Sequence, residues 1–293
     1  MKRREFVAAA ASALASARLA SSQTAVVEKP RLKGRLPQAA MRFNFAPGTP
    51  FDEMCRQAAS IGIKGFDITG PNDWPTLKKY GLISTVSILG PLNQEDGMAH
   101  KELHNALEPG VRAAIDAVSA ESYPNLGVLA GQRKVLSYEE SADNIVAFLN
   151  RLKRQAEDKN VTLLMEMVNS KYENPNLGRK DSACDHLAIA VDIVKRVNSP
   201  HVKLVFDAYH VDIMDGDVAA HLREHFQWIS HFHTAGVPGR GPIDETQELN
   251  YRFLAQTLVD LGFTGYVAHE YRPAPGTDPL KQLARAMEII DGP

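Results

Sequence analysis

The sequence predicts a single-domain α/β fold, a (β/α)8 TIM barrel that follows a short N-terminal export segment. Short apolar runs alternate with stretches of helical periodicity along nearly the whole chain, and no break in composition marks a second domain. The 293 residues, 44% of them hydrophobic and 23% charged, are enough for one large α/β domain. These observations favour a barrel in which each strand is followed by a helix.

Eight apolar runs are expected to form the strands. Each is a short apolar run, and a longer segment with a helical pattern lies between one run and the next. Eight parallel strands in this rhythm favour a closed barrel over an open sheet. The expected strands are residues 41–46, 64–69, 82–89, 125–131, 161–168, 202–207, 228–234 and 265–271.

The segments between the strands carry apolar residues at helical spacing. Ser137, Asp217 and Asp278 stand where N-caps are expected, because their side chains can accept a free backbone N–H of the first turn. The clearest helical stretches are residues 51–62, 108–120, 137–157, 186–198, 246–262 and 278–291.

A doubly wound open sheet is the structural alternative. Such chains usually carry Gly-x-Gly-x-x-Gly after their first strand, to hold a dinucleotide. Here the corresponding residues, 45–53, read FAPGTPFDE and contain one glycine. The barrel is therefore the preferred interpretation.

The N-terminus has the pattern of an export signal. Arg3 and Arg4 precede an uncharged, alanine-rich run over residues 6–17, and the whole resembles a Tat signal. The run is too short for a membrane span, so no membrane contact beyond export is expected. The expected location is periplasmic or exported, or cytoplasmic if the signal does not function. We assign residues 1–38 to signal and linker, and residues 39–293 to the barrel.

Charge and cysteine content exclude several classes of protein. The formal net charge is -2, so no basic surface for nucleic acid is expected. Cys55 and Cys184 are too few for a disulfide framework and lack metal-site spacing, so two separate buried thiols are expected.

Four consecutive strands end on side chains that can bind a metal. Glu166, Asp207, His233 and Glu270 stand near the C-terminal ends of the fifth to eighth strands, where barrel active sites lie. Three carboxylates so close together would repel one another unless a proton or cation intervened. Oxygen ligands with one imidazole suit Mn²⁺, Mg²⁺, Co²⁺ or Zn²⁺. Each residue alone could instead be an ordinary polar group at a strand end.

Two further residues are expected to face a substrate. His210 follows Asp207 by three residues, in what we interpret as a loop. Arg240 lies in the glycine- and proline-rich segment TAGVPGRGPID and could grip a carboxylate or hydroxyl groups. A capping histidine and a surface arginine are the structural alternatives. Asn44 and Asp67 could also line the pocket, and His231 lies two residues deeper than His233 on the same face.

These segments resemble hydroxypyruvate isomerase, in the xylose isomerase-like superfamily that also holds ketose 3-epimerases and endonuclease IV. The resemblance runs from about residue 41 to the end and is most specific in the second half. The matching segments are LLMEMVNSK, VFDAYHVDIMDGD, HFHTAGVPGRGPIDETQELNY and GYVAHEYRP, with looser matches at GFDITGPNDWPTLKKYGL and NLGVLAG.

The resemblance implies a divalent metal, most commonly Mg²⁺ or Mn²⁺, held by Glu166, Asp207, His233 and Glu270. The two glutamates would also exchange a proton with a small-molecule substrate, converting hydroxypyruvate to tartronate semialdehyde through an enediolate. His210 and Arg240 would contact substrate oxygens. Relatives of this kind are commonly dimers or tetramers, so a homo-oligomer is expected.

Three other functions compete with this one. An exported ketose 3-epimerase or sugar isomerase would use the same metal site, and a histidine at position 233 is similar to those enzymes. A phosphodiesterase would need more metals and a basic surface. A binding protein without turnover would not need two glutamates flanking its ligand.

Overall fold

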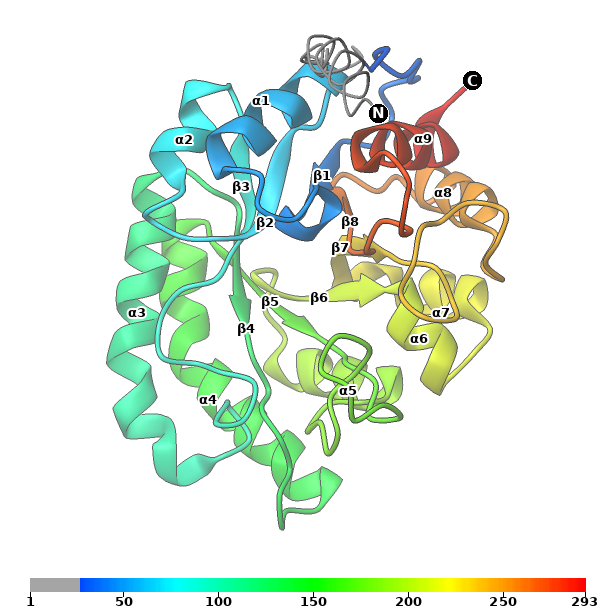
Figure 1. Ribbon diagram of the computed structural model, residues 1–293. Helices are drawn as coiled ribbons and strands as arrows, with labels where there is room; N and C mark the ends of the chain where they lie inside the picture. Colours follow the sequence, from blue (N-terminus) through cyan, green and yellow to red (C-terminus); the bar gives the residue numbers. More distant parts are fainter. Residues whose placement is uncertain (1–26) are drawn as a thin grey trace, which may run out of the picture.

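The computed structural model describes residues 27–293, which fold into a closed barrel of eight parallel strands in sequence order, each paired with the next and β8 with β1 (Figure 1). This confirms the predicted fold. The predicted export signal lies within residues 1–26, outside the described residues. The strands are β1 Gln38–Ala40, β2 Gly65–Thr69, β3 Ile83–Ser87, β4 Asn125–Val128, β5 Thr162–Glu166, β6 Val202–Asp207, β7 Ile229–Thr234 and β8 Tyr266–His269.

The helices surround the barrel (Figure 1). Ser137 and Asp278 cap their helices through side-chain bonds as predicted, but Asp217 makes no such bond. Among residues 27–293, no helix has both the length and the apolar composition needed to cross a membrane. The α-helices are α1 Phe51–Ile61, α2 Trp74–Lys79, α3 His104–Ala120, α4 Tyr138–Lys159, α5 Leu187–Val197, α6 Ala208–Met214, α7 Val218–His225, α8 Tyr251–Asp260 and α9 Pro279–Asp291, and the 3-10 helices are η1 Arg42–Asn44, η2 Lys101–Leu103 and η3 Phe226–Trp228.

The first strand lies earlier than predicted. We expected residues 41–46 to form it, but β1 is Gln38–Ala40 and the chain then turns into η1. The side chain of Asn44 causes the turn, because it accepts the Met41 N–H at 2.7 Å and donates to the Tyr271 carbonyl at 2.9 Å. The strand was missed because its residues are small or polar and give no apolar signal. Asn44 is fully buried and does not line the cavity at the strand ends, although we expected that it could.

The hydrophobic core has two separate parts. The larger part fills the layer between strands and helices, and it includes both cysteines, which are buried free thiols as expected. The smaller part lies inside the barrel and consists of Val86, Leu164 and Val205, with Ile88 packed against them. Leu164 and Val205 stand two residues before Glu166 and Asp207 in their strands, on the same face and deeper in the barrel.

The segment before β1 is tied to the last helix. The buried Asp291 carboxylate accepts the backbone N–H groups of Gly34 at 2.6 Å and Arg35 at 2.9 Å, and it also pairs with the Arg35 side chain at 3.0 Å. The final residues of the predicted linker are thus held against α9, and β1 begins at the last residue of the segment that we assigned to signal and linker.

Replacing Asp291 with alanine is expected to destabilise the barrel. The substitution leaves two backbone N–H groups without an acceptor, which costs about 2–4 kcal/mol of unfolding free energy. Urea denaturation followed by circular dichroism measures the loss. Asp158, an exposed carboxylate paired with Arg154, is the matched control, and its alanine variant should lose less than about 1 kcal/mol. Equal losses in both variants would contradict the proposed role of Asp291.

Candidate metal and substrate site

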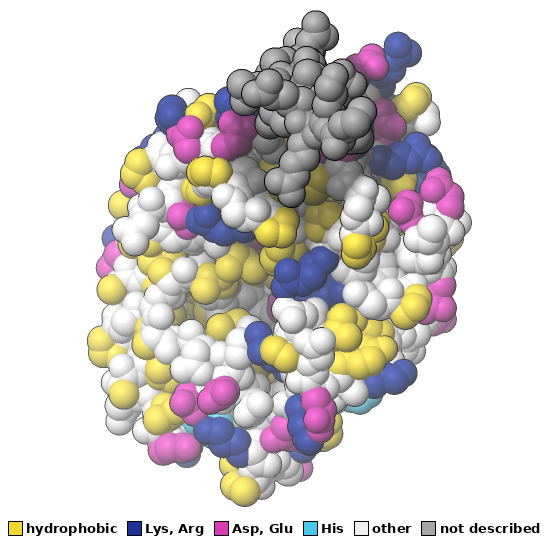
Figure 2. Space-filling model, viewed as in Figure 1, with side chains coloured by type: hydrophobic (Ala, Val, Ile, Leu, Met, Phe, Trp, Pro, Cys, Tyr) yellow, Lys and Arg dark blue, Asp and Glu magenta, His cyan; other side chains and the backbone are white. Residues whose placement is uncertain are grey.

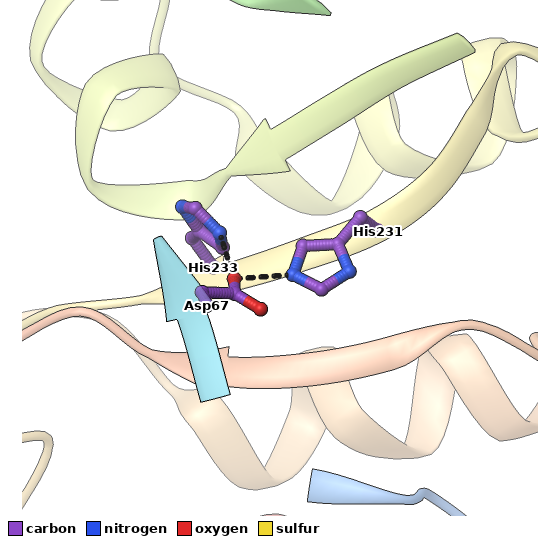
Figure 3. Close-up of side chains that lie close together, drawn as sticks. All are labelled: Asp67, His231 and His233. Atoms are coloured by element: carbon purple, nitrogen blue, oxygen red, sulfur yellow. Dashed lines mark hydrogen bonds and ion pairs between the residues drawn. The ribbon is translucent and has the colours of Figure 1, made fainter. Parts of the chain in front are cut away.

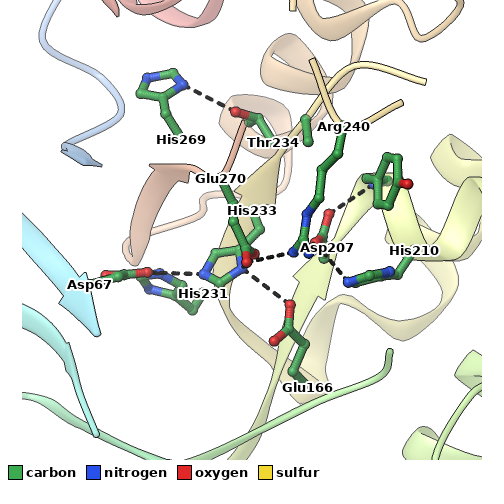
Figure 4. Close-up of polar contacts among 12 residues, drawn as sticks. Asp67, Glu166, Asp207, His210, His231, His233, Thr234, Arg240, His269 and Glu270 are labelled. Atoms are coloured by element: carbon green, nitrogen blue, oxygen red, sulfur yellow. Dashed lines mark hydrogen bonds and ion pairs between the residues drawn. The ribbon is translucent and has the colours of Figure 1, made fainter. Parts of the chain in front are cut away.

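The structure brings the four predicted ligands together at the C-terminal mouth of the barrel (Figure 4). Glu166 and Asp207 are the last residues of β5 and β6, His233 lies in β7, and Glu270 directly follows β8. Asp207 and His233 are directly opposite each other in the parallel register of β6 and β7. Each residue offers one ligand atom, and these atoms all lie within 4.8 Å of one another.

The donor atoms of this cluster face one another. The Nδ1 atom of His233 lies 2.6 Å from Glu270 Oε2 and 3.3 Å from Glu166 Oε1. Among the described residues, Asp207 Oδ2 is buried and has no hydrogen-bond partner, and the nitrogens of Arg240 and His210 lie 3.5 Å from it. Buried oxygens are normally satisfied, so a free oxygen beside two further carboxylates indicates a missing positive partner. Three carboxylates and an imidazole fit a divalent cation at this point.

The pKa shifts of the cluster residues also indicate that a positive charge is missing. Burial and the neighbouring Glu270 raise the pKa of Asp207 to about 7. Burial opposes ionisation of Glu270, but Arg240 and His233 outweigh it and lower the pKa of Glu270 to about 2. Burial would also lower the pKa of His233, but Glu270 and Asp67 raise it well above its usual value. Without a cation, the protein therefore balances the cluster with protons and Arg240.

A second buried group supports His233 from below. Asp67 in β2 lies 2.9 Å from His233 Nε2 and 2.7 Å from His231 Nε2, both measured to its Oδ2 atom (Figure 3). Burial opposes ionisation of Asp67, but His231 and His233 lower its pKa, so it remains a carboxylate. A carboxylate there accepts a hydrogen bond from the Nε2–H group of His233, so the Nδ1 atom faces the cluster.

We expected Asp67 only to line the pocket, and His231 only to lie deeper than His233 on the same face of its strand. The hydrogen bond between Asp67 and His231 joins residues 164 positions apart in the sequence, across the inside of the barrel. The available signal was the alternation that puts His231 and His233 on one face of β7, together with a carboxylate near the end of β2. That signal does not show which of the facing strands supplies the partner.

His210 points into the site from a helix. We expected it in a loop, but α6 begins at Ala208, immediately after Asp207, so His210 lies in its first turn. Its Nδ1 lies 2.6 Å from the side-chain nitrogen of Asn169, and its buried Nε2 lies 3.5 Å from Asp207 Oδ2 without a hydrogen-bond partner among the described residues. Burial and Arg240 lower the pKa of His210, so it is neutral. With Nδ1 as the acceptor, Nε2 is a free N–H donor at the site.

Arg240 reaches the cluster from the loop after β7. One terminal nitrogen lies 2.5 Å from Glu270 Oε1 and 3.5 Å from Asp207 Oδ2. Its backbone φ of 57° lies in the left-handed region, which a residue other than glycine adopts at an energetic cost. Strain of this kind is common at functional sites, where it serves to aim a side chain.

The cluster forms one wall of a cavity of about 310 Å³. Polar and charged residues line the side formed by β5 to β8 and the loops after them, including Arg179 and Arg272, which sequence analysis did not single out. Hydrophobic residues line the opposite side, near β2 to β4. In the space-filling view, hydrophobic and cationic side chains border the same hollow in the middle of the face (Figure 2).

Curated relatives are named as isomerases. A human protein named putative hydroxypyruvate isomerase is 29% identical over 182 residues, covering 59% of this chain and 62% of the relative, less than two thirds of its length. A protein from Cupriavidus necator named 2-oxo-tetronate isomerase is 40% identical over 119 residues, covering 40% of this chain and 42% of the relative. Another 2-oxo-tetronate isomerase, from Haemophilus influenzae, is 26% identical and covers 76% of this chain and 88% of the relative.

Solved structures share the whole barrel. An AP endonuclease, family 2, from Brucella melitensis superposes with a TM-score of 0.76 and 27% identity, covering 85% of this chain and 97% of that one. A D-psicose 3-epimerase superposes with a TM-score of 0.67 and 15% identity over 87% of this chain and all of that one, which shows the shared fold. The sequence model of the xylose isomerase-like TIM barrel family matches residues 55–291. The chain belongs to the xylose isomerase-like TIM barrel family.

Proposed function

We propose that this protein is a metal-dependent isomerase of small 3-hydroxy-2-oxo acids, with hydroxypyruvate as the simplest substrate and tartronate semialdehyde as its product. The observation that carries the proposal is the pair Glu166 and Glu270, which converge on one point from β5 and from the end of β8. Hydroxypyruvate and 2-oxo-tetronate, which appear in the names of the relatives, share the group R–CHOH–CO–COO⁻.

The reaction moves one hydrogen between adjacent carbons. One of the two glutamates removes the proton from the carbon that bears the hydroxyl group, and the other delivers a proton to the neighbouring carbon. The hydroxyl proton passes to the former carbonyl oxygen, so the product is the isomeric hydroxy-carbonyl acid. A divalent cation held by Glu166, Asp207, His233 and Glu270 supplies positive charge to the substrate oxygens as negative charge develops.

Two other residues orient the substrate in this proposal. The free N–H of His210 is available to a carbonyl or hydroxyl oxygen, because its other ring nitrogen is occupied by Asn169. Arg240 offers a guanidinium group, which suits a carboxylate, beside the glutamates. The neutral state of His210 avoids a second fixed charge beside Arg240.

A ketose 3-epimerase or sugar isomerase remains the second candidate. The D-psicose 3-epimerase structures share the barrel, and the same cluster of four ligands would serve that reaction. The cavity favours the smaller substrate. A hexulose brings hydroxyl groups toward the β2 to β4 side, where hydrophobic residues dominate and unpaired hydroxyls would lower affinity.

Replacing either glutamate is expected to remove turnover. Glu166→Gln and Glu270→Gln each keep the size of the side chain but cannot exchange a proton, so kcat should fall about 10²–10⁴-fold. Turnover of hydroxypyruvate by the Mn²⁺-loaded protein measures this. Glu173, an exposed loop glutamate paired with Lys180, is the matched control, and Glu173→Gln should keep full activity. Wild-type activity in either Glu166→Gln or Glu270→Gln would refute the assigned roles.

Metal removal is expected to lower thermal stability. A cation that binds only the folded protein at 100 times its Kd stabilises it by about 2.7 kcal/mol. Tm should therefore rise when Mn²⁺ is returned to chelator-treated protein. Asp207→Asn should respond much less, although an asparagine can still accept the Tyr209 N–H that caps α6. An unchanged Tm in the wild-type protein at saturating Mn²⁺ would argue against the site.

Asp67 is expected to tune metal affinity without touching the metal. An amide at this position has no negative charge with which to hold the two imidazole N–H groups, so Asp67→Asn should weaken Mn²⁺ binding roughly 10–100-fold in a calorimetric titration. Asp215, whose carboxylate binds His186 at 2.6 Å away from the cluster, provides a matched control. Asp215→Asn should bind Mn²⁺ normally. The same Kd in both variants would exclude this role for Asp67.

A further inference from the structure

The cavity has a second half that the proposed chemistry does not use. The metal cluster, His210 and Arg240 occupy the side formed by β5 to β8. The other side is lined by hydrophobic residues at the C-terminal ends of β2, β3 and β4 and just beyond them. The hydrophobic residues that line this side are Ile68, Val86, Ile88, Val128 and Leu129.

The floor of the cavity is an apolar cluster with no cover. Val86, Leu164 and Val205 pack with one another and with Ile88, apart from the main core between strands and helices. All four side chains line the cavity. An apolar floor that opens on a concave site is suited to an apolar part of a ligand.

Ile68 extends this apolar surface to the rim. Its φ of 56° is unusual for a β-branched residue, and the strand pairing of β2 with β3 is irregular on both sides of Asp67. The side chain is 48% exposed and lines the cavity. Strained backbone clusters at ligand sites, so a large exposed hydrophobic side chain at the cavity rim is well placed to contact an apolar part of a ligand.

This half of the cavity offers few hydrogen-bond partners to a substrate. Asp67 is its one carboxylate, and both of its oxygens are engaged, Oδ1 by Thr85 at 2.5 Å and Oδ2 by His231 and His233. The other polar side chain on this side is Gln94. A hydroxyl group placed over the apolar floor would lose its bonds to water without replacement.

The cavity has room for more than the smallest substrate. Its volume of about 310 Å³ is at the lower end of the range for small-molecule sites. Hydroxypyruvate has seven non-hydrogen atoms, so a substrate with a short additional arm on the hydroxyl-bearing carbon suits a cavity of this size.

We propose that the preferred substrate is a 3-hydroxy-2-oxo acid with a short alkyl arm, R–CHOH–CO–COO⁻, whose R group rests on Val86, Ile88 and Ile68. The inference rests on the proposed function and names the substrate class of the same site. The reaction is balanced without a co-reactant. The C3–H bond breaks, a C2–H bond forms, the hydroxyl proton moves from O3 to O2, and the product is R–CO–CHOH–COO⁻.

Two substrates with the same number of non-hydrogen atoms test the proposal. In 3-hydroxy-2-oxopentanoate, R is ethyl, and in 2-oxo-tetronate, R is hydroxymethyl. The Mn²⁺-loaded wild-type protein should turn over the ethyl compound with a kcat/KM about tenfold or more above that of 2-oxo-tetronate, because only the latter buries an unpaired hydroxyl. Hydroxypyruvate gives the baseline, above which each buried methylene should add about fourfold.

Two variants that introduce a hydroxyl group locate the preference in the apolar half. Val86→Thr places a hydroxyl group on the floor, and Ile68→Thr places one at the exposed rim, where it does not disturb the core. Each should lower the ratio of kcat/KM for the ethyl compound to that for 2-oxo-tetronate, by about tenfold for Val86→Thr. Val135→Thr is the matched control, because Val135 is 97% exposed and does not line the cavity, and its ratio should stay at the wild-type value.

The outcomes separate this inference from the proposed function. Turnover of 2-oxo-tetronate equal to or better than that of the ethyl compound would overturn the alkyl preference and leave the isomerase standing. A preference for the ethyl compound that neither Val86→Thr nor Ile68→Thr reduces would overturn its assignment to this surface. No turnover of any of the three acids would overturn both proposals.

Discussion

Three carboxylates converge at one end of the barrel, and the need to balance their charge governs the arrangement of the whole mouth. Arg240 forms an ion pair with Glu270, and the raised pKa of His233 favours its protonated form when no cation is present. The pKa of Asp207 rises to about 7 because burial and Glu270 both oppose its ionisation. A divalent cation at this point would neutralise the carboxylates in place of the bound protons and Arg240. Metal binding should therefore stabilise the folded protein.

The barrel makes this concentration of charge possible. Parallel strands place their C-terminal ends at the same rim, so residues distant in the sequence arrive at one level, as Asp207 and His233 do in adjacent strands. The layer beneath is equally specific, because Asp67 holds His233 and His231 together. The position of the His233 imidazole thus depends on a strand on the far side of the barrel.

The mouth is chemically divided, and this division links the fold to selectivity. Charged groups gather at the ends of β5 to β8, whereas Val86 in β3, together with Leu164 and Val205 deeper in β5 and β6, forms an apolar floor beneath them. In the proposed function the charged half carries out the reaction. We propose that the apolar half discriminates among substrates with the same hydroxy-carbonyl group, because it offers few hydrogen-bond partners to a hydroxyl group.

The sequence by itself determined the eight alternating strands and helices and the four candidate ligands. Hydrophobic periodicity and position at a strand end are local properties, so they can be recognised in a linear sequence. It misplaced β1, since Gln38 and its neighbours are held by the closure of the barrel on β8 and give no apolar signal of their own. Only the tertiary structure decided that Asp67 meets His231, that His210 lies in a helix, and that one side of the cavity is apolar. These features arise from contacts across the barrel, and a linear pattern carries no record of which distant strands face each other.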